Sequence, residues 1–266
     1  MSSETYEILA IKYGEFADRR RHESFIAADD HAAPHPIDYF VWVIRNGQRS
    51  IVVDTGFDAA EGAKRGRKIS RTPTQALEMV GVAAGNVEQV VVTHLHYDHA
   101  GTLGAFPKAR FHLQEAEMAY ATGACMCHGH LRYPFTADHV CEMVKNVYSG
   151  RVEFHDGDAE IAPGVTVHKI GGHSRGLQCV RIATASGAVV LASDASHFYE
   201  NFEKGKVFPI TIDIGDVLNG YTRLQALAAS PRHVVPGHDP LVLQRYPALN
   251  SQTQGIVHRL DVARTD

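Results

Sequence analysis

Short apolar runs, rich in β-branched and aromatic residues, recur along the chain between turn-forming residues, and this pattern predicts strands. In the first half we expect strands from Ile37 to Asn46 and from Ser50 to Asp54, separated at Gly47. The next run, 88–93 (EQVVVT), is almost continuously apolar, which predicts a strand buried on both faces. The second half repeats the pattern over residues 165–170, 178–184, 188–193 and 233–235.

Amphipathic segments between these runs predict helices. Thr72 and Gln75 flank Pro73 in the spacing of a capping box, so a helix should begin there and end near Gly81. Further helices are expected over 114–122, 138–148 and 216–229, the last stopping before Pro231. Two β-rich halves, each followed by helices, predict an α/β fold in which helix layers cover a two-sheet core.

Composition narrows the class of protein. The 266 residues suffice for one large domain or two small ones, and 44% hydrophobic content is that of an ordinary globular protein. A net charge of −4 argues against a dedicated nucleic-acid binder. We interpret the basic runs 19–22 and 64–71 as solvated faces, with contact to an anionic partner as the alternative. No run of about 18 apolar residues predicts a membrane span.

Cellular location follows from the N-terminus and the cysteines. The opening MSSETYEILA lacks the basic and apolar regions of a secretory leader. Four cysteines in a chain of this length do not form a disulfide framework, so we expect a cytoplasmic protein.

Histidines carry the strongest chemical signal, because several of the 17 cluster in sequence. His94, His96, Asp98 and His99 form an H-x-H-x-D-H motif directly after the predicted buried strand. Three imidazoles and a carboxylate so close together are costly to bury unless a cation binds them. We expect His94 and His96 to take one ion and Asp98 and His99 a second. Such ligands suit zinc, and also manganese, iron or cobalt.

Further metal ligands must come from other parts of the chain, because one short loop cannot enclose two ions. His173, Asp194 and His238 each follow a predicted strand, where a scaffold can fix geometry without burying the chemistry. These three residues are therefore the remaining candidate ligands.

At this point the sequence resembles the metallo-β-lactamase fold superfamily, over roughly residues 35–240. The resemblance is carried by the segments 51–56 (IVVDTG), 94–99, 171–174 (GGHS) and 237–239 (GHD), together with Asp194. It implies an αββα four-layer sandwich, with residues 1–266 as a single domain and a helical insertion at about 114–150 that shapes the substrate pocket.

The resemblance also implies a ligand set. One metal would bind His94, His96 and His173, and a second would bind Asp98, His99 and His238. Asp194 would lie between the two ions. Asp54 would orient a ligand histidine, although its place before Thr55 and Gly56 also fits a simple turn residue.

Within that superfamily the chain looks most like the N-acyl homoserine lactonases. Asp194-Ala195-Ser196 and the segment 200–203 (ENFE) are similar to theirs, and the intact Asp98-His99 pair differs from members with a cysteine ligand. These lactonases have a substrate-binding tyrosine three residues after the shared aspartate, where this chain has His197. Tyr199 is the alternative replacement.

The reaction implied is the opening of a lactone by two divalent ions, with zinc the first choice. A hydroxide shared by the ions would attack the substrate carbonyl. We hypothesise that Asp98 carries a proton to the leaving alkoxide, that Asp194 holds both ions, and that His197 donates a hydrogen bond to the substrate. We expect the protein to bind a small-molecule substrate and to have neither a nucleic acid nor a membrane as a partner. A homodimer is an open alternative to a monomer.

The same scaffold serves other activities, so alternatives stay open. Three alternatives are hydrolytic: the substrate would be a thioester, as for glyoxalase II, another cyclic ester or amide, or a phosphodiester. Two are not: oxidation of a substrate at a single iron, and binding of a ligand without catalysis. Residues 124–141, with Cys125, Cys127, His128, His130 and Cys141, could form a separate zinc site. Their spacing lacks the paired two-residue gaps of structural zinc sites, so we favour a pocket-shaping insertion.

Overall fold

A computed structural model describes residues 4–27 and 31–266 of the chain. Residues 1–3 of the N-terminal segment inspected for a leader lie outside this range. In the described part, no helix is long and apolar enough to cross a membrane.

Within the described residues, the first sheet has eight strands, with β13-β1-β2-β3-β5-β6-β7 side by side and β4 attached to β1. Strands β3, β5, β6 and β7 run parallel, whereas β1 and β2 are antiparallel neighbours. Val90 and Val91 of β5 are fully buried, which confirms the predicted strand with two covered faces. The bounds are β1 Glu7–Phe16, β2 Ile37–Arg45, β3 Ser50–Val53, β4 Lys68–Ile69, β5 Gln89–Val91, β6 Arg110–Gln114, β7 Val152–His155 and β13 Val257–Arg259.

In the part of the chain that the structure describes, the second sheet has five strands in the order β12-β11-β10-β9-β8 and packs against the first. One apolar cluster contains Ile8, Trp42 and Val53 from the first sheet together with Val167 and Val180 from the second. These side chains form the core between the sheets. The bounds are β8 Ala159–Ala162, β9 Val165–Lys169, β10 Gln178–Thr184, β11 Gly187–Ser193 and β12 Val234–Pro236.

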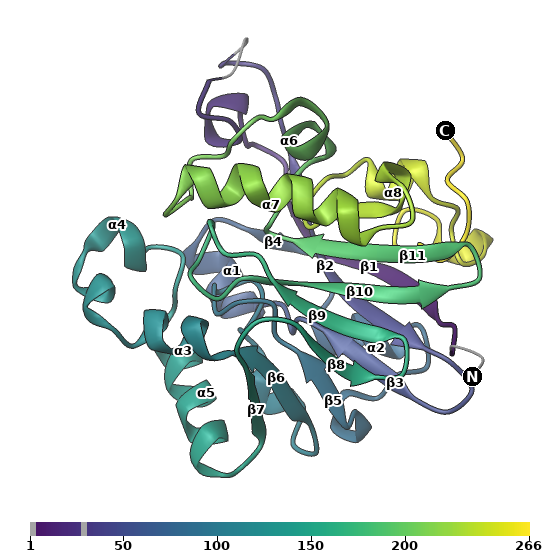
Figure 1. The fold of residues 1–266 in the computed structure, drawn as a ribbon, viewed down its shortest axis with the longest axis horizontal. Coiled ribbons are helices and arrows are strands. Elements are labelled where there is room, and N and C mark those ends of the chain that lie inside the picture. The colour runs from purple at the N-terminus through teal and green to yellow at the C-terminus, as the bar shows by residue number, and fades with distance from the viewer. Residues whose placement is uncertain (1–3, 28–30) are drawn as a thin grey trace.

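Helices cover the outer faces of both sheets. Leu77 of α2 and Met143 of α5 pack with the first sheet, whereas Tyr221 and Leu224 of α7 pack with the second. Figure 1 shows α7 running alongside β11, and α5 beside β7. The predicted αββα layering is thus confirmed. The bounds are α1 Ala59–Lys64, α2 Pro73–Glu78, α3 Glu115–Ala121, α4 Gly129–Arg132, α5 Ala137–Tyr148, α6 Tyr199–Lys204, α7 Ile214–Leu227 and α8 Val242–Arg245.

The predicted elements are all present, and the differences are local. Thr72 caps α2 as expected, accepting a bond from the Gln75 amide at 3.2 Å. The structure also contains elements that the sequence pattern did not predict: β1, β4, β6, β7, β8, β13 and the short helices α1, α4, α6 and α8. The solvated face predicted for residues 19–22 is wrong at Arg19, which is buried and stacks over Phe198.

The packing of β11 gives a test of the core between the layers. Leu191 is 1% exposed, so Leu191→Ala should leave a cavity and lower the free energy of unfolding by about 2–5 kcal/mol. Urea denaturation measures this change. The control Leu218→Ala alters a side chain of α7 that is 42% exposed and should change stability by no more than about 0.5 kcal/mol. Equal effects of the two substitutions would contradict the assigned core.

Candidate metal centre

The H-x-H-x-D-H loop begins where β5 ends and is held at both sides by buried carboxylates. Asp54, at the end of β3, accepts hydrogen bonds from the Thr93 amide at 2.8 Å and the Thr93 hydroxyl at 2.9 Å. The Leu95 amide donates to Glu117 of α3 at 3.0 Å. The chain that carries His94 and His96 is therefore fixed by neighbouring elements as well as by its own strand.

The loop before His173 depends on two glycines. Gly171 and Gly172 have φ values of 75° and 80°, a region that side chains with a Cβ rarely adopt. A Cβ on Gly172 would lie 2.7 Å from the backbone nitrogen of Val217, at the start of α7. The Nδ1–H of His173 donates to the Ile210 carbonyl at 2.6 Å, which leaves its Nε2 facing the other histidines.

Asp54 and Ser193 are the non-glycine residues with positive φ in the described chain, at 60° and 47°. Both follow or end a strand beside the histidine cluster, at β3 and β11. Such backbone is costly and persists where the surroundings fix it. The Ser193 hydroxyl lies 2.8 Å from that of Thr93, so the two strained turns are linked, and the turn at Ser193 directs Asp194 into the cluster.

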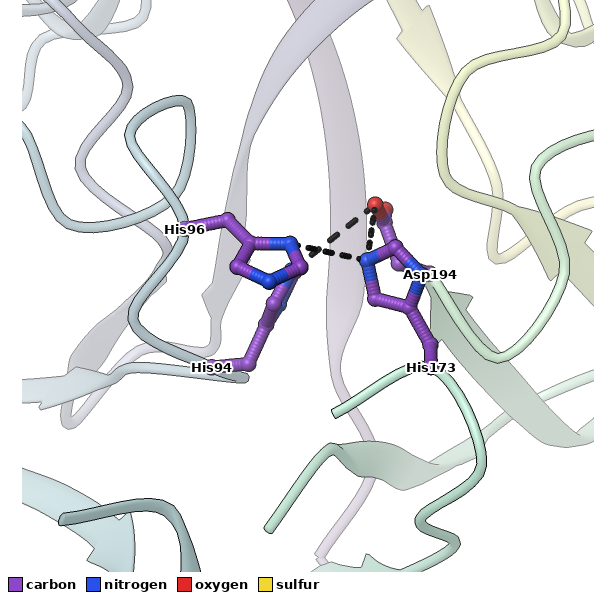
Figure 2. A group of neighbouring side chains, drawn as sticks. All are labelled: His94, His96, His173 and Asp194. Atoms are coloured by element: carbon purple, nitrogen blue, oxygen red, sulfur yellow. Dashed lines mark hydrogen bonds and ion pairs between the residues drawn. The ribbon is translucent and has the colours of Figure 1, made fainter. Parts of the chain in front are cut away.

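Asp194 joins two groups of potential ligands, because its two oxygens face different histidines. Its Oδ2 lies 3.2 Å from Nε2 of His173 and 3.8 Å from Nε2 of His94. Its Oδ1 lies 3.3 Å from Nε2 of His99 and 3.0 Å from Nε2 of His238. Figure 2 shows His94 and His96 approaching from one side, and His173 and Asp194 from the other.

The structure therefore brings together every ligand candidate from the sequence. Potential ligand atoms within 4.8 Å of one another form one group of four residues, His94, His96, His173 and Asp194. A second such group contains Asp98, His99 and His238. Asp98 is the most exposed of these side chains, at 11%, and its Oδ2 lies 3.7 Å from Nε2 of His238.

The chemistry of these groups fits divalent cations. Nε2 of His94, Nε2 of His99 and Oδ1 of Asp194 are buried and have no hydrogen-bond partner. Such atoms are costly in a protein interior, and a shared cation would satisfy them. Burial, with neighbouring imidazoles, holds the pKa of His94 and of His96 well below the usual value, so both rings offer a lone pair at neutral pH.

The second nitrogens of three histidines are also fixed. Nδ1 of His99 lies 2.7 Å from Oδ2 of Asp54, and Nδ1 of His238 donates to the Asp38 carbonyl at 2.9 Å. With His173 bonded to the Ile210 carbonyl, each of these rings has Nε2 directed at Asp194. Ligand histidines in metalloproteins are oriented in this way. The contact at His99 is the geometry expected if Asp54 orients a ligand.

His197, and not Tyr199, lies at the cluster. Nε2 of His197 is 2.9 Å from Oδ2 of Asp194, and its ring stacks on Phe208 with centroids 4.1 Å apart. Burial lowers the pKa of His197 to about 3, so the ring is neutral. Tyr199 is buried beneath the Arg245 guanidinium, 3.9 Å from its ring centroid.

Glu117 is a residue of the site that sequence analysis missed. This buried carboxylate also accepts from the Ser174 hydroxyl at 2.7 Å and the Gly176 amide at 2.9 Å. It thereby links the loop of His94 and His96 to the loop of His173. An acidic residue in the first turn of a helix is ordinarily interpreted as a favourable partner of the helix dipole, so its sequence gave no sign of this link.

The segment 114–150 forms α3, α4 and α5 and borders the histidines. The Phe135 ring contacts His96 edge-on, with centroids 4.6 Å apart. Phe135 also lines a cavity of about 970 Å³ with Met126, Val140 and Cys141. Among the described residues, the three cysteines of this segment do not gather with histidines into a group that could hold a metal.

Comparison with known proteins agrees with this geometry. The family model described as the metallo-beta-lactamase superfamily matches residues 36–244, most of the chain and both ligand groups. The chain belongs to this superfamily. An N-acyl homoserine lactonase from a Bacillus species is 31% identical over 167 residues, 61% of this chain and 60% of the lactonase. The chain thus matches about three fifths of the length of that relative.

Solved structures support the fold of this superfamily member. A quorum-quenching N-acyl homoserine lactone lactonase superposes with a TM-score of 0.74 at 24% identity, covering 89% of this chain and 94% of that one. AidC, a dizinc quorum-quenching lactonase bound to a product, gives 0.71 at 14% identity and covers 90% of each chain. Both likenesses concern the fold alone.

The role of Glu117 leads to a stability test. In Glu117→Gln, an NH₂ group would face donors that the carboxylate now satisfies, so the free energy of unfolding should fall by about 1–3 kcal/mol. Chemical denaturation of the metal-free protein measures it. Glu115→Gln, at an exposed position of the same helix turn, should have almost no effect. Matching stabilities for the two variants would show that the link between the loops contributes little.

Proposed function

We propose that this superfamily member is a hydrolase that opens a lactone, using two divalent metal ions, with zinc as the first choice. The observation that carries the proposal is the position of Asp194, whose Oδ2 faces one histidine group and whose Oδ1 faces the other. A carboxylate so placed can hold an ion on each side. The similarity to an N-acyl homoserine lactonase supports the substrate class, and the dizinc neighbour supports the choice of metal.

His94, His96 and His173 would hold one ion, and Asp98, His99 and His238 the other, with Asp194 between them. Two divalent ions held by these residues would supply a hydroxide at neutral pH and would polarise a carbonyl oxygen. A lactone has such a carbonyl, and its leaving alkoxide stays attached to the product. The neutral imidazoles of His94 and His96 match these ligand roles.

Asp98 is our candidate for moving the proton. It lies between Nε2 of His99 and Nε2 of His238, at 3.7 Å from each, and it keeps partial access to solvent. A carboxylate there can take a proton at one oxygen and deliver it to the alkoxide of the opened ring. Asp54 would keep His99 oriented throughout, because its oxygen lies 2.7 Å from Nδ1 of that ring.

The substrate's acyl part would lie against the 114–150 segment. Phe135 contacts His96 and also lines the 970 Å³ cavity. Apolar groups of Met126 and Val140 line this cavity, together with the cations Lys64, Arg65 and Arg132. An apolar chain carrying a polar amide suits such a wall.

A panel assay tests the proposed function. The purified protein, with its metals counted by elemental analysis, should release protons with N-acyl homoserine lactones near pH 7, because opening a neutral ester forms a carboxylic acid. Glutathione thioesters and phosphodiesters serve as competing substrates. Chelation should abolish the activity, and Zn²⁺ should restore it. Faster turnover of a thioester or a phosphodiester by the two-metal protein would replace the proposed substrate class.

His197 has a predicted kinetic effect. We propose that it holds the Asp194 carboxylate, since its Nε2 lies 2.9 Å from Oδ2. His197→Ala should lower kcat about 10–100-fold with little change in KM, and His197→Gln, which keeps an N–H donor, should recover part of the loss. Both variants are compared at equal metal content. A rise in KM with unchanged kcat would instead show that His197 contacts the substrate, as the sequence suggested.

A further inference from the structure

A second set of metal-ligand side chains lies on the paired strands β6 and β7. The parallel register places His112 opposite Glu153 and Gln114 opposite His155, so these side chains project from the same face. Nδ1 of His112 lies 3.1 Å from Nε2 of His155, and the two rings are nearly parallel, with centroids 5.3 Å apart. None of the three residues His112, Glu153 and His155 belongs to the groups around Asp194.

We propose that His112, Glu153 and His155 bind a divalent transition-metal ion, separate from the two proposed above. One ligand atom from each residue lies within 4.8 Å of the others. Ligand atoms about 2.0–2.2 Å from a tetrahedral Zn²⁺ are separated by roughly 3.3 Å, so the two nitrogens are already near their required spacing. Two imidazoles and a carboxylate suit Zn²⁺ and leave a fourth position for water.

Burial gives the two histidines the protonation state that a metal requires. His112 is 2% exposed and His155 is 9% exposed. Burial lowers the pKa of His112 to about 4 and also lowers that of His155, so neither ring carries a proton charge that would repel a cation near pH 7. The Glu153 side chain is 46% exposed, which gives an ion access from solvent.

The strand positions define what the ion would do. The His112 carbonyl accepts from the Val92 amide and from Nε2 of Gln178, both at 3.1 Å, so β6 is firmly held within the sheet. β7 is the last strand of the first sheet and pairs with β6. An ion bound by Glu153 and His155 would fasten this end strand to His112 of β6. The site is therefore proposed as a structural one.

Metal counting on matched variants tests the proposal. The wild type, equilibrated with micromolar Zn²⁺ and freed of unbound metal, should retain one more ion per chain than Glu153→Gln or His155→Gln. Excess Zn²⁺ should also raise the Tm of the wild type by about 5 °C more than that of either variant. Hydrolytic activity should be the same in all three proteins, since these residues lie outside the proposed catalytic groups.

Arg110→Gln is the control, because it removes the ion pair of Arg110 with Glu153, at 3.7 Å, and leaves the ligands intact. It should retain the additional ion. Equal metal counts in the wild type, Glu153→Gln and His155→Gln would overturn the proposal. The contact between His112 and His155 would then be a hydrogen bond between two imidazoles and not a metal site. The count separates this result from failure of the proposed hydrolase, because loss of the ions at Asp194 would leave the difference between wild type and variants unchanged.

Discussion

The burial of one carboxylate among imidazoles is the interaction on which this molecule depends. Asp194 is 3% exposed, and its oxygens face His94, His173, His99 and His238 at 3.0–3.8 Å. Removing so many polar groups from water costs free energy that other interactions must offset. Some of the buried nitrogens have no hydrogen-bond partner, so hydrogen bonds within the protein offset only part of this cost. Compensation by cations is the account that unites the fold with the proposed chemistry.

The two-sheet scaffold holds Asp194 and the histidines in place because these candidate ligands follow the ends of its strands. β5, β9, β11 and β12 each lead into a loop that supplies ligands, and the strands themselves are fixed in two apolar cores. Strain is accepted where it is needed, at Asp54 and Ser193, and both residues bond to Thr93. The backbone of the site is thus determined by the sheets, and the side chains by bonds such as that from His99 to Asp54.

The two proposed groups of metal ligands differ in how the fold brings their residues together. Around Asp194, four loops converge and the set is rich enough for two ions. On β6 and β7, the regular register of adjacent strands alone places His112 beside Glu153 and His155. The group around Asp194 needs strained loops at the ends of several strands, whereas the group on β6 and β7 needs only two parallel strands at the edge of a sheet. The first suits chemistry and the second suits fastening a strand.

The sequence by itself determined the layered α/β fold, the H-x-H-x-D-H loop and the candidate ligands His173, Asp194 and His238. The spacing of hydrophobic residues and the local motifs carry this information, because a buried strand is apolar and a metal-binding loop is rich in histidine. Only the tertiary structure decided that His197 reaches Asp194 while Tyr199 does not, that Glu117 joins two loops, and that His112 meets His155. These contacts depend on the paths of the loops and on the order of the strands in the sheets. Neither can be predicted from how far apart the residues are in the sequence.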